Sequence, residues 1–263
     1  MKSALFFDVD GTLIDSYHEQ GFIAPAVLDE LLRVQGLGHK IFLSSGRSRN
    51  LLTPELLAPG FDGFVLINGG YVEVDDQPLY EERMGVGLAR RTVDFLEDLG
   101  CEYLIVSAKA TYTKRSNTNL VEFFSRWHDG IFTFDYDLDQ VLERAIKMEA
   151  IVEPERRPEV TALAQKELGS AISCDGHGGE GTFELYPTAI SKAKGIGMVV
   201  ERMGIDVRHT YGFGDGVNDL EMIRSCGCGV AMGNAEKPVK DAANMVCPPV
   251  WEDGLAVALR ELF

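Results

Sequence analysis

Two carboxylates stand at the end of the first apolar stretch of the chain. In the segment ALFFDVDGT, Asp8 and Asp10 directly follow an apolar run that is typical of a buried strand. A carboxylate can act as a covalent nucleophile, and its oxygens are ligands that a hard cation such as Mg²⁺ prefers. Two carboxylates at this spacing therefore suit phosphoryl transfer, in which one attacks phosphorus and the other moves the proton.

A calcium-binding loop is the alternative for the same segment. Asp8, Asp10 and Glu19 match positions one, three and twelve of an EF-hand. Thr12 and Leu13, however, stand where that loop requires an acid and a glycine, and a strand rather than a helix precedes the acids. The pattern favours a catalytic pair at the end of a strand.

Two further clusters could bind an anion. Ser45 and Gly46, in the segment SSGR, follow an expected strand at 41–43, where a hydroxyl and a backbone N–H group would face the ligand. Alone, this segment is more often a helix cap. Lys192 stands at the start of an expected helix and could neutralise both a phosphate and a nucleophile, although a surface lysine would look the same.

The last cluster is the segment GFGDGVND, whose glycines permit a tight turn at the end of a strand. Asp215, at the strand tip, is the natural third carboxylate for Mg²⁺. Asp219 could cap the following helix. Open α/β sheets bind their ligands at such strand ends, so we expect all four clusters to meet at one edge of a sheet.

The elements that must position these clusters alternate between strands and helices. Expected strands at 4–7, 41–43 and 64–67 alternate with helices at 25–36 and 49–57, a hairpin follows at 71–81, and the alternation resumes after Ser191. This order predicts an α/β fold with a doubly wound, Rossmann-like parallel sheet. The catalytic core would be discontinuous and consist of residues 1–82 and 184–263.

Residues 83–183 have a different pattern. Amphipathic helices expected at 88–99 and 158–168 are interleaved with strands such as 103–106 and 146–152, which predicts an inserted α+β domain. The glycine-rich run at 175–181 is typical of a tight hairpin, and a substrate loop is the weaker interpretation.

Composition and charge narrow the classes of function. The 263 residues include 25 Lys and Arg against 41 Asp and Glu, and the formal net charge of −16 disfavours a nucleic-acid partner. No apolar run approaches the roughly 18 residues that span a bilayer, so we expect a cytoplasmic protein with no membrane partner. The five cysteines are scattered, as in a reducing compartment. A small anionic metabolite remains a suitable partner; the sequence predicts no oligomeric state.

The order of the four clusters, with a domain inserted between the second and the third, resembles the haloacid dehalogenase superfamily, specifically its Cof-type sugar-phosphate phosphatases. The segments DVDGT, SGR and GDGVND, together with Lys192, are similar to the four motifs of that superfamily. The segment GVAMGNA and the late Asp253-Gly254 resemble its C-terminal half. Ser45 stands where threonine is common, which keeps the hydroxyl.

The resemblance implies a Mg²⁺-dependent phosphatase that hydrolyses small phosphorylated metabolites, sugar phosphates or similar, through an aspartyl-phosphate. Asp8 would be the nucleophile and Asp10 the general acid and base. Mg²⁺ would bind the Asp8 carboxylate, the Asp10 backbone carbonyl and Asp215, with Asp219 behind them. Four residues would bind the phosphoryl group: Ser45, Gly46, Lys192 and Asn218. The inserted domain would act as a cap that selects the leaving group.

Two rival functions stay open. A phosphomutase of the phosphomannomutase type shares the motif order and a related cap, and differs in whether water or a second sugar hydroxyl receives the phosphoryl group. A non-catalytic metabolite-binding module would keep the fold without turnover, and the presence of all the motif acids disfavours it.

Overall fold

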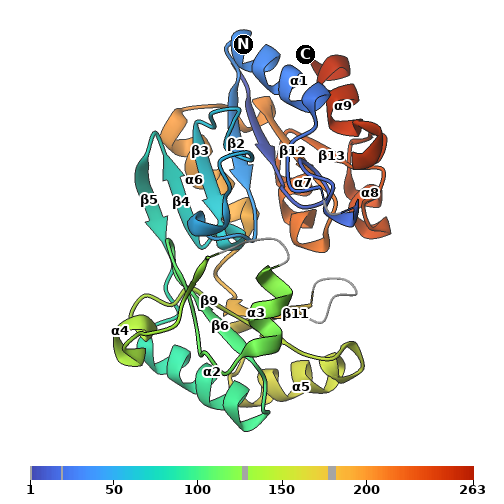
Figure 1. The fold of residues 1–263 in the computed structure, drawn as a ribbon. Helices are drawn as coiled ribbons and strands as arrows, with labels where there is room; N and C mark the ends of the chain where they lie inside the picture. Colours follow the sequence, from blue (N-terminus) through green and yellow to red (C-terminus); the bar gives the residue numbers. More distant parts are fainter. Residues whose placement is uncertain (1, 19, 126–129, 177–181) are drawn as a thin grey trace. The chain divides into compact units, whose positions relative to one another are not determined.

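The computed structural model describes residues 2–18, 20–125, 130–176 and 182–263 (Figure 1). The chain forms two compact units. The first comprises Met1–Arg47, Leu52–Tyr80 and Ser191–Phe263, and the second comprises Ser48–Leu51 and Glu81–Ile190. Each unit has its own sheet and its own buried core. Within the described ranges, no helix has both the length and the apolar character needed to span a membrane.

The first unit is built on an eight-stranded sheet with the order β14-β13-β12-β1-β2-β3-β4-β5. Six neighbouring strands are parallel: β14 (Met245–Val246), β13 (Cys228–Ala231), β12 (Thr210–Gly214), β1 (Ala4–Phe7), β2 (Lys40–Ser44) and β3 (Gly63–Leu66). Strand β4 (Tyr71–Val74) is antiparallel to β3, and β5 (Gln77–Glu81) follows it. Asp75 and Asp76 join β4 to β5 with φ values of 51° and 58°, as a tight hairpin requires. The predicted α/β core is confirmed.

Strand β1 lies in the middle of this sheet, and all four of its residues are buried, as its unbroken apolar run requires. Ala4 and Phe6 share a core cluster with Ile196, Val199 and Met222. The last three belong to α6 (Lys192–Met203) and α7 (Leu220–Ser225). The remaining helices of this unit are α1 (Pro25–Gly36), α8 (Lys237–Ala242) and α9 (Gly254–Leu262), of which α1 and α9 pack together.

The segment 49–57 differs from its predicted helix. It contains a single 3₁₀ turn, Arg49–Leu51, followed by turns. Pro54 has no N–H group to donate and disfavours helical backbone at Thr53, so a helix cannot run through this point.

The second unit holds a six-stranded sheet with the order β10-β11-β9-β6-β7-β8. Its strands are β6 (Tyr103–Val106), β7 (Thr111–Thr113), β8 (Phe132–Thr133), β9 (Lys147–Ile151), β10 (Ile172–Gly176) and β11 (Thr182–Pro187). Strand β11 pairs with both β9 and β10, so it belongs wholly to this unit. The unit therefore runs to Ile190, whereas the sequence had placed its end at residue 183.

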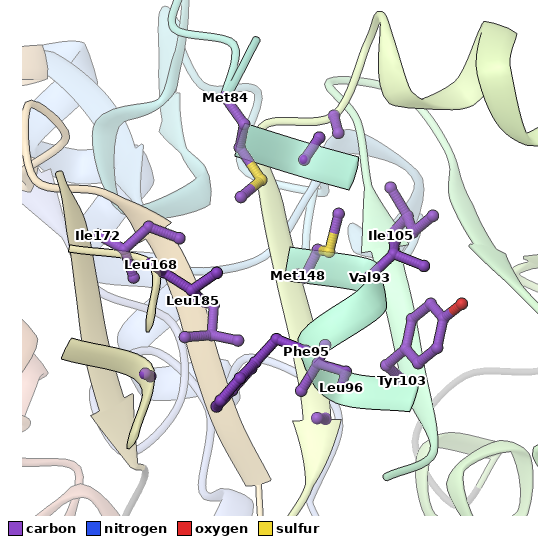
Figure 2. Close-up of a cluster of buried hydrophobic side chains, with 14 of the residues drawn as sticks. Met84, Val93, Phe95, Leu96, Tyr103, Ile105, Met148, Leu168, Ile172 and Leu185 are labelled. Carbon is purple, nitrogen blue, oxygen red and sulfur yellow. The ribbon is translucent and has the colours of Figure 1, made fainter. Parts of the chain in front are cut away.

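Helices and strands of the second unit bury apolar side chains in one common cluster. Figure 2 shows Val93 and Leu96 of α2 (Val86–Asp98) in a buried cluster with Ile105, Met148 and Leu185 of the strands. The other helices are α3 (Thr118–Ser125), α4 (Leu138–Leu142) and α5 (Arg157–Glu167).

Charged side chains alternate with apolar ones along the strands of this second sheet. Lys147, Glu149 and Glu184 alternate with the cluster residues along β9 and β11 and form a buried ion cluster. Burial of these charges is tolerated because opposite charges are paired.

Candidate active site

Three of the four predicted clusters lie at the carboxyl ends of adjacent strands of the first unit, whereas Lys192 lies at the start of helix α6. Asp8 follows β1, and its N–H group donates to the Phe213 carbonyl of β12 at 2.9 Å, so the pairing of the two strands continues into the site. Asp215 follows β12, and Ser45 follows β2. Since parallel neighbours end at the same edge of the sheet, segments far apart in the sequence meet there.

Lys192 connects two of the acids. Its Nζ donates to Asp8 Oδ1 and to Asp219 Oδ1, both at 2.6 Å, and the residue is 1% exposed. Burial alone would lower the pKa of Lys192, but the charges of Asp219 and Asp8 outweigh it and raise the pKa above its ordinary value. A permanent positive charge therefore stands beside the predicted nucleophile.

A close backbone contact fixes the start of α6, from which Lys192 projects. The Oγ of Ser191 caps this helix by accepting from the Lys194 N–H group at 3.2 Å. A Cβ at Gly69 would lie 2.1 Å from the Ser191 carbonyl oxygen, and Gly69 has a φ of +96°. Only glycine fits this position, so the turn at Gly69 determines how closely the lysine approaches the sheet.

Three buried carboxylates lie together at the centre of the site. Asp8, Asp215 and Asp219 each offer an oxygen within 4.8 Å of the others, and none is more than 6% exposed. Burial raises the pKa of Asp8 well above its ordinary value, Asp219 raises it further, and Lys192 opposes the shift. Burial and the charge of Asp219 raise the pKa of Asp215 to about 7. A divalent cation would relieve this concentration of negative charge.

Asp219 accepts hydrogen bonds from Lys192 and from the backbone of the turn that carries Asp215. Oδ1 accepts from Lys192, while Oδ2 accepts from the N–H groups of Asp215 and Gly216 at 3.0 and 3.1 Å. Asp219 therefore shapes the turn that carries Asp215.

Three residues that were not predicted as site residues hold Asp215. Tyr17 Oη and Asn234 Nδ2 both donate to Asp215 Oδ2 at 3.1 Å, and Thr12 Oγ1 donates to Oδ1 at 3.2 Å. Asn234 lies in the segment GVAMGNA, so its resemblance to the superfamily was the available signal. No local pattern marks Tyr17, because the contact joins residues 198 positions apart.

Asp10 lies outside the buried cluster and pairs with Arg47. The Arg47 Nε donates to Asp10 Oδ2 at 2.9 Å, and Nη2 donates to Oδ1 at 2.6 Å. The Asp10 side chain is 44% exposed, against 9% for that of Asp8. The turn between the two acids and Thr12 depends on Gly11, whose φ is +82° and whose Cβ would lie 2.3 Å from Asp215 Oδ2. The two carboxylates of the first cluster therefore have different surroundings.

Three of the four predicted phosphoryl-binding residues gather around Asn68, which was not predicted. Asn218 Nδ2 donates to Asn68 Oδ1 at 3.2 Å, and a Cβ at Gly46 would lie 3.1 Å from the same oxygen. The Asn68 N–H group donates to the Ser45 carbonyl at 3.0 Å. Asn68 has a φ of 55°, a backbone conformation that asparagine tolerates better than most residues, whereas the preceding Ile67, at 52°, is strained. The structure therefore brings Ser45, Gly46 and Asn218 to one place.

The calcium alternative finds no support in these contacts. The carboxylate that joins Asp8 is Asp215 from β12, not a residue of the same loop. Glu19, the twelfth position of that alternative, lies outside the described residues, as do residues 177–181 of the glycine-rich run.

The fold is a parallel sheet with acids at its strand ends and an inserted α+β unit. This arrangement is the one that the predicted hydrolase superfamily has. The chain belongs to the haloacid dehalogenase-like hydrolase family, whose sequence pattern matches residues 5–259.

Individual relatives agree with this. The chain is 32% identical over 266 residues to the putative phosphatase YkrA of Bacillus subtilis, covering 98% of this chain and 96% of the relative. It is 25% identical over 276 residues to the 5-amino-6-(5-phospho-D-ribitylamino)uracil phosphatase YitU of the same organism, covering 97% and 96%. The solved structure of the subclass IIB sugar phosphatase BT4131 matches with a TM-score of 0.86 and 26% identity, covering 99% and 98%. The predicted superfamily and its enzyme class, a phosphatase, are confirmed.

Proposed function

We propose that the protein is a Mg²⁺-dependent phosphatase that hydrolyses small phosphorylated metabolites, sugar phosphates or similar, through a phosphorylated Asp8. One observation carries the proposal: buried Asp8 contacts Lys192 at 2.6 Å and lies beside Asp215, while a second carboxylate, Asp10, stands two residues away and is partly exposed. This arrangement separates a nucleophile from a proton carrier. The names of the relatives support the same chemistry.

The donor set fits Mg²⁺. Carboxylate oxygens of Asp8 and Asp215 come within 4.8 Å of each other, and hard oxygen donors are what this cation prefers. We assign the backbone carbonyl of Asp10 as the third protein ligand and place Asp219 behind the ligands, since its oxygens bind Lys192 and the backbone N–H groups of the turn that carries Asp215. When bound, the ion would offset the negative charge of the acids and of the transferring phosphoryl group.

The chemical steps are assigned to two side chains. An Asp8 oxygen bonds to phosphorus as the bond to the leaving group breaks, and Asp10 gives its proton to the oxygen that departs with the electron pair. Asp10 then takes a proton from water, whose oxygen bonds to phosphorus while the bond to Asp8 breaks. The electron pair of that bond returns to the Asp8 carboxylate, so the enzyme is regenerated.

The surrounding residues bind the phosphoryl oxygens. Lys192 supplies a fixed charge beside Asp8, and hydrogen-bond donors come from Ser45, Gly46 and Asn218. Such preorganised donors stabilise the charge that develops on a transferring phosphoryl group. We assign selection of the leaving group to the inserted unit, because the residues named above would contact only the phosphoryl group.

A screen of phosphorylated metabolites tests the proposal. Hexose phosphates, pentose phosphates and pyridoxal phosphate would be offered with and without Mg²⁺, and released inorganic phosphate would be measured. We expect release that needs Mg²⁺ and is absent from an Asp8→Asn control. Formation of an isomeric sugar phosphate without phosphate release would support the phosphomutase instead, and binding without turnover would support the non-catalytic module.

Tyr17→Phe is expected to weaken Mg²⁺ binding. The substitution removes the hydroxyl that donates to Asp215 Oδ2 at 3.1 Å and leaves the ring, so the carboxylate loses one of its orienting partners. Loss of an outer hydrogen bond to a metal ligand typically lowers affinity about 10-fold or more. Calorimetric titration of the free protein with Mg²⁺ measures the change. An unchanged affinity would mean that Thr12 and Asn234 suffice to orient Asp215.

Mg²⁺ affinity is expected to fall as the pH drops below neutral. The pKa of Asp215 is raised to about 7 without metal, so below that pH the carboxyl carries a proton that Mg²⁺ must displace. The raised pKa of Asp8 acts in the same direction. Titrations at about pH 6 and about pH 8 should therefore differ by roughly 10-fold or more in affinity. Proton release, measured in buffers of different ionisation enthalpy, should accompany binding at the lower pH. Equal affinities would contradict the assignment.

A further inference from the structure

We propose that Arg47 is a positioning residue that orients the Asp10 carboxylate for proton transfer. The inference rests on the proposed function, because that function gives Asp10 its role as acid and base. Arg47 donates through Nε to one Asp10 oxygen at 2.9 Å and through Nη2 to the other at 2.6 Å.

The two hydrogen bonds restrict the carboxylate in a way that one could not. A guanidinium is planar, and its two parallel donors fix both the position and the plane of a carboxylate. Asp10 needs such a restraint, because its side chain is 44% exposed and would otherwise rotate in solvent. The Arg47 side chain is 14% exposed, so it is the more rigid partner of the pair.

Arg47 is itself anchored to the turn that carries the phosphoryl-binding residues. Its N–H group donates to Ser45 Oγ at 3.2 Å, and its carbonyl accepts from the Ile67 N–H group at 3.0 Å. One short turn therefore holds both Ser45 and the group that orients the proton carrier. The distance between the phosphoryl site and the acid is set by this turn, and small errors in such a distance are costly for catalysis.

A purely structural role would have a different consequence. Strands β1 and β2, which lead to Asp10 and to this turn, are already joined by their parallel pairing. A partly exposed ion pair adds little to the stability of a fold. Substitution of Arg47 should therefore leave the fold intact and affect proton transfer.

The test compares two leaving groups. A p-nitrophenolate departs without a proton, whereas the alkoxide of a hexose 6-phosphate needs one, so only the second ester depends on a well-placed acid. We expect Arg47→Met to lower kcat/KM for hexose 6-phosphate by about 10-fold or more, and for p-nitrophenyl phosphate by less than about 3-fold. Arg208→Met, which removes an exposed arginine paired with Asp206, is the matched control and should change neither.

Two further variants complete the experiment. In an Asp10→Asn background, Arg47→Met should cost no additional activity with hexose 6-phosphate, because the two residues act as one unit. Arg47→Lys keeps the positive charge but cannot donate two parallel hydrogen bonds to one carboxylate. We therefore expect it to lose activity with hexose 6-phosphate and not with p-nitrophenyl phosphate, as Arg47→Met does. It replaces Arg47→Met in the test if that variant fails to fold. The positioning role of Arg47 would be overturned if its substitution lowered kcat/KM equally for both esters or for neither. An additional loss of activity in the Asp10→Asn background would also overturn it. Failure of the unmodified protein to hydrolyse either ester would instead contradict the proposed function.

Discussion

Asp8→Asn protein is expected to lose turnover of phosphate esters by about 10⁴-fold or more, because no other group can replace the covalent nucleophile. The amide has the same shape but cannot form the acyl-phosphate. Asp8 is also buried beside Lys192 at 2.6 Å and next to Asp215, so an amide there alters the charge of the site at its centre. Phosphate release in the presence of Mg²⁺ measures the effect.

The fold of this variant should survive. Burial and the charge of Asp219 raise the pKa of Asp8, which means that its ionised form opposes folding at neutral pH. Replacing it with a neutral amide is therefore not expected to lower the temperature of unfolding. Loss of activity in a folded Asp8→Asn protein would then reflect the loss of the nucleophile and not a loss of structure. Undiminished turnover would remove Asp8 from the mechanism.

Lys192→Met is expected to lose both activity and stability. The side chain is 1% exposed and bonds Asp8 and Asp219 at 2.6 Å each, so its removal leaves two buried carboxylates without their shared cation. Breaking a buried ion pair in this way typically costs about 3–5 kcal/mol. Urea unfolding measured alongside phosphate release would show both losses.

The pH dependence of that variant distinguishes electrostatics from packing. Without Lys192, the pKa of Asp8 should rise further above its ordinary value, so protonation of Asp8 at lower pH removes the repulsion and part of the stability should return. Lys194→Met, on the same helix but exposed, is the matched control and should cost less than about 1 kcal/mol. A loss in Lys192→Met that is independent of pH would indicate a packing defect instead.

The sequence alone predicted the parts of the fold and the site that follow from local pattern and from the order of the elements. An unbroken apolar run before Asp8, glycines around Asp215 and alternating elements predicted a parallel sheet with acids at its edge, and the structure places them there. The order of the motifs along the chain predicted the superfamily to which the chain belongs. These features depend on spacing along the chain, which a single sequence displays.

The sequence alone could not predict contacts that depend on three-dimensional packing. Arg47 binds Asp10 and Tyr17 binds Asp215 across 37 and 198 positions, and no local pattern marks either residue as a partner of an acid. Asn68 enters the site through an unusual backbone conformation that follows a strained Ile67. The helix predicted at 49–57 is absent for a local reason, since Pro54 interrupts it. The inserted unit extends beyond its predicted end because β11 pairs with β9 and β10 of that unit.

The central claim is that the phosphoryl group is carried by Asp8. Rapid acid quenching of the protein during turnover of a hydrolysed ester, followed by peptide mapping, tests it directly. The account predicts a phosphoryl group on the peptide that contains Asp8, removed by hydroxylamine and absent from Asp8→Asn protein. Steady release of inorganic phosphate with no phosphorylated Asp8 at any quench time would contradict it.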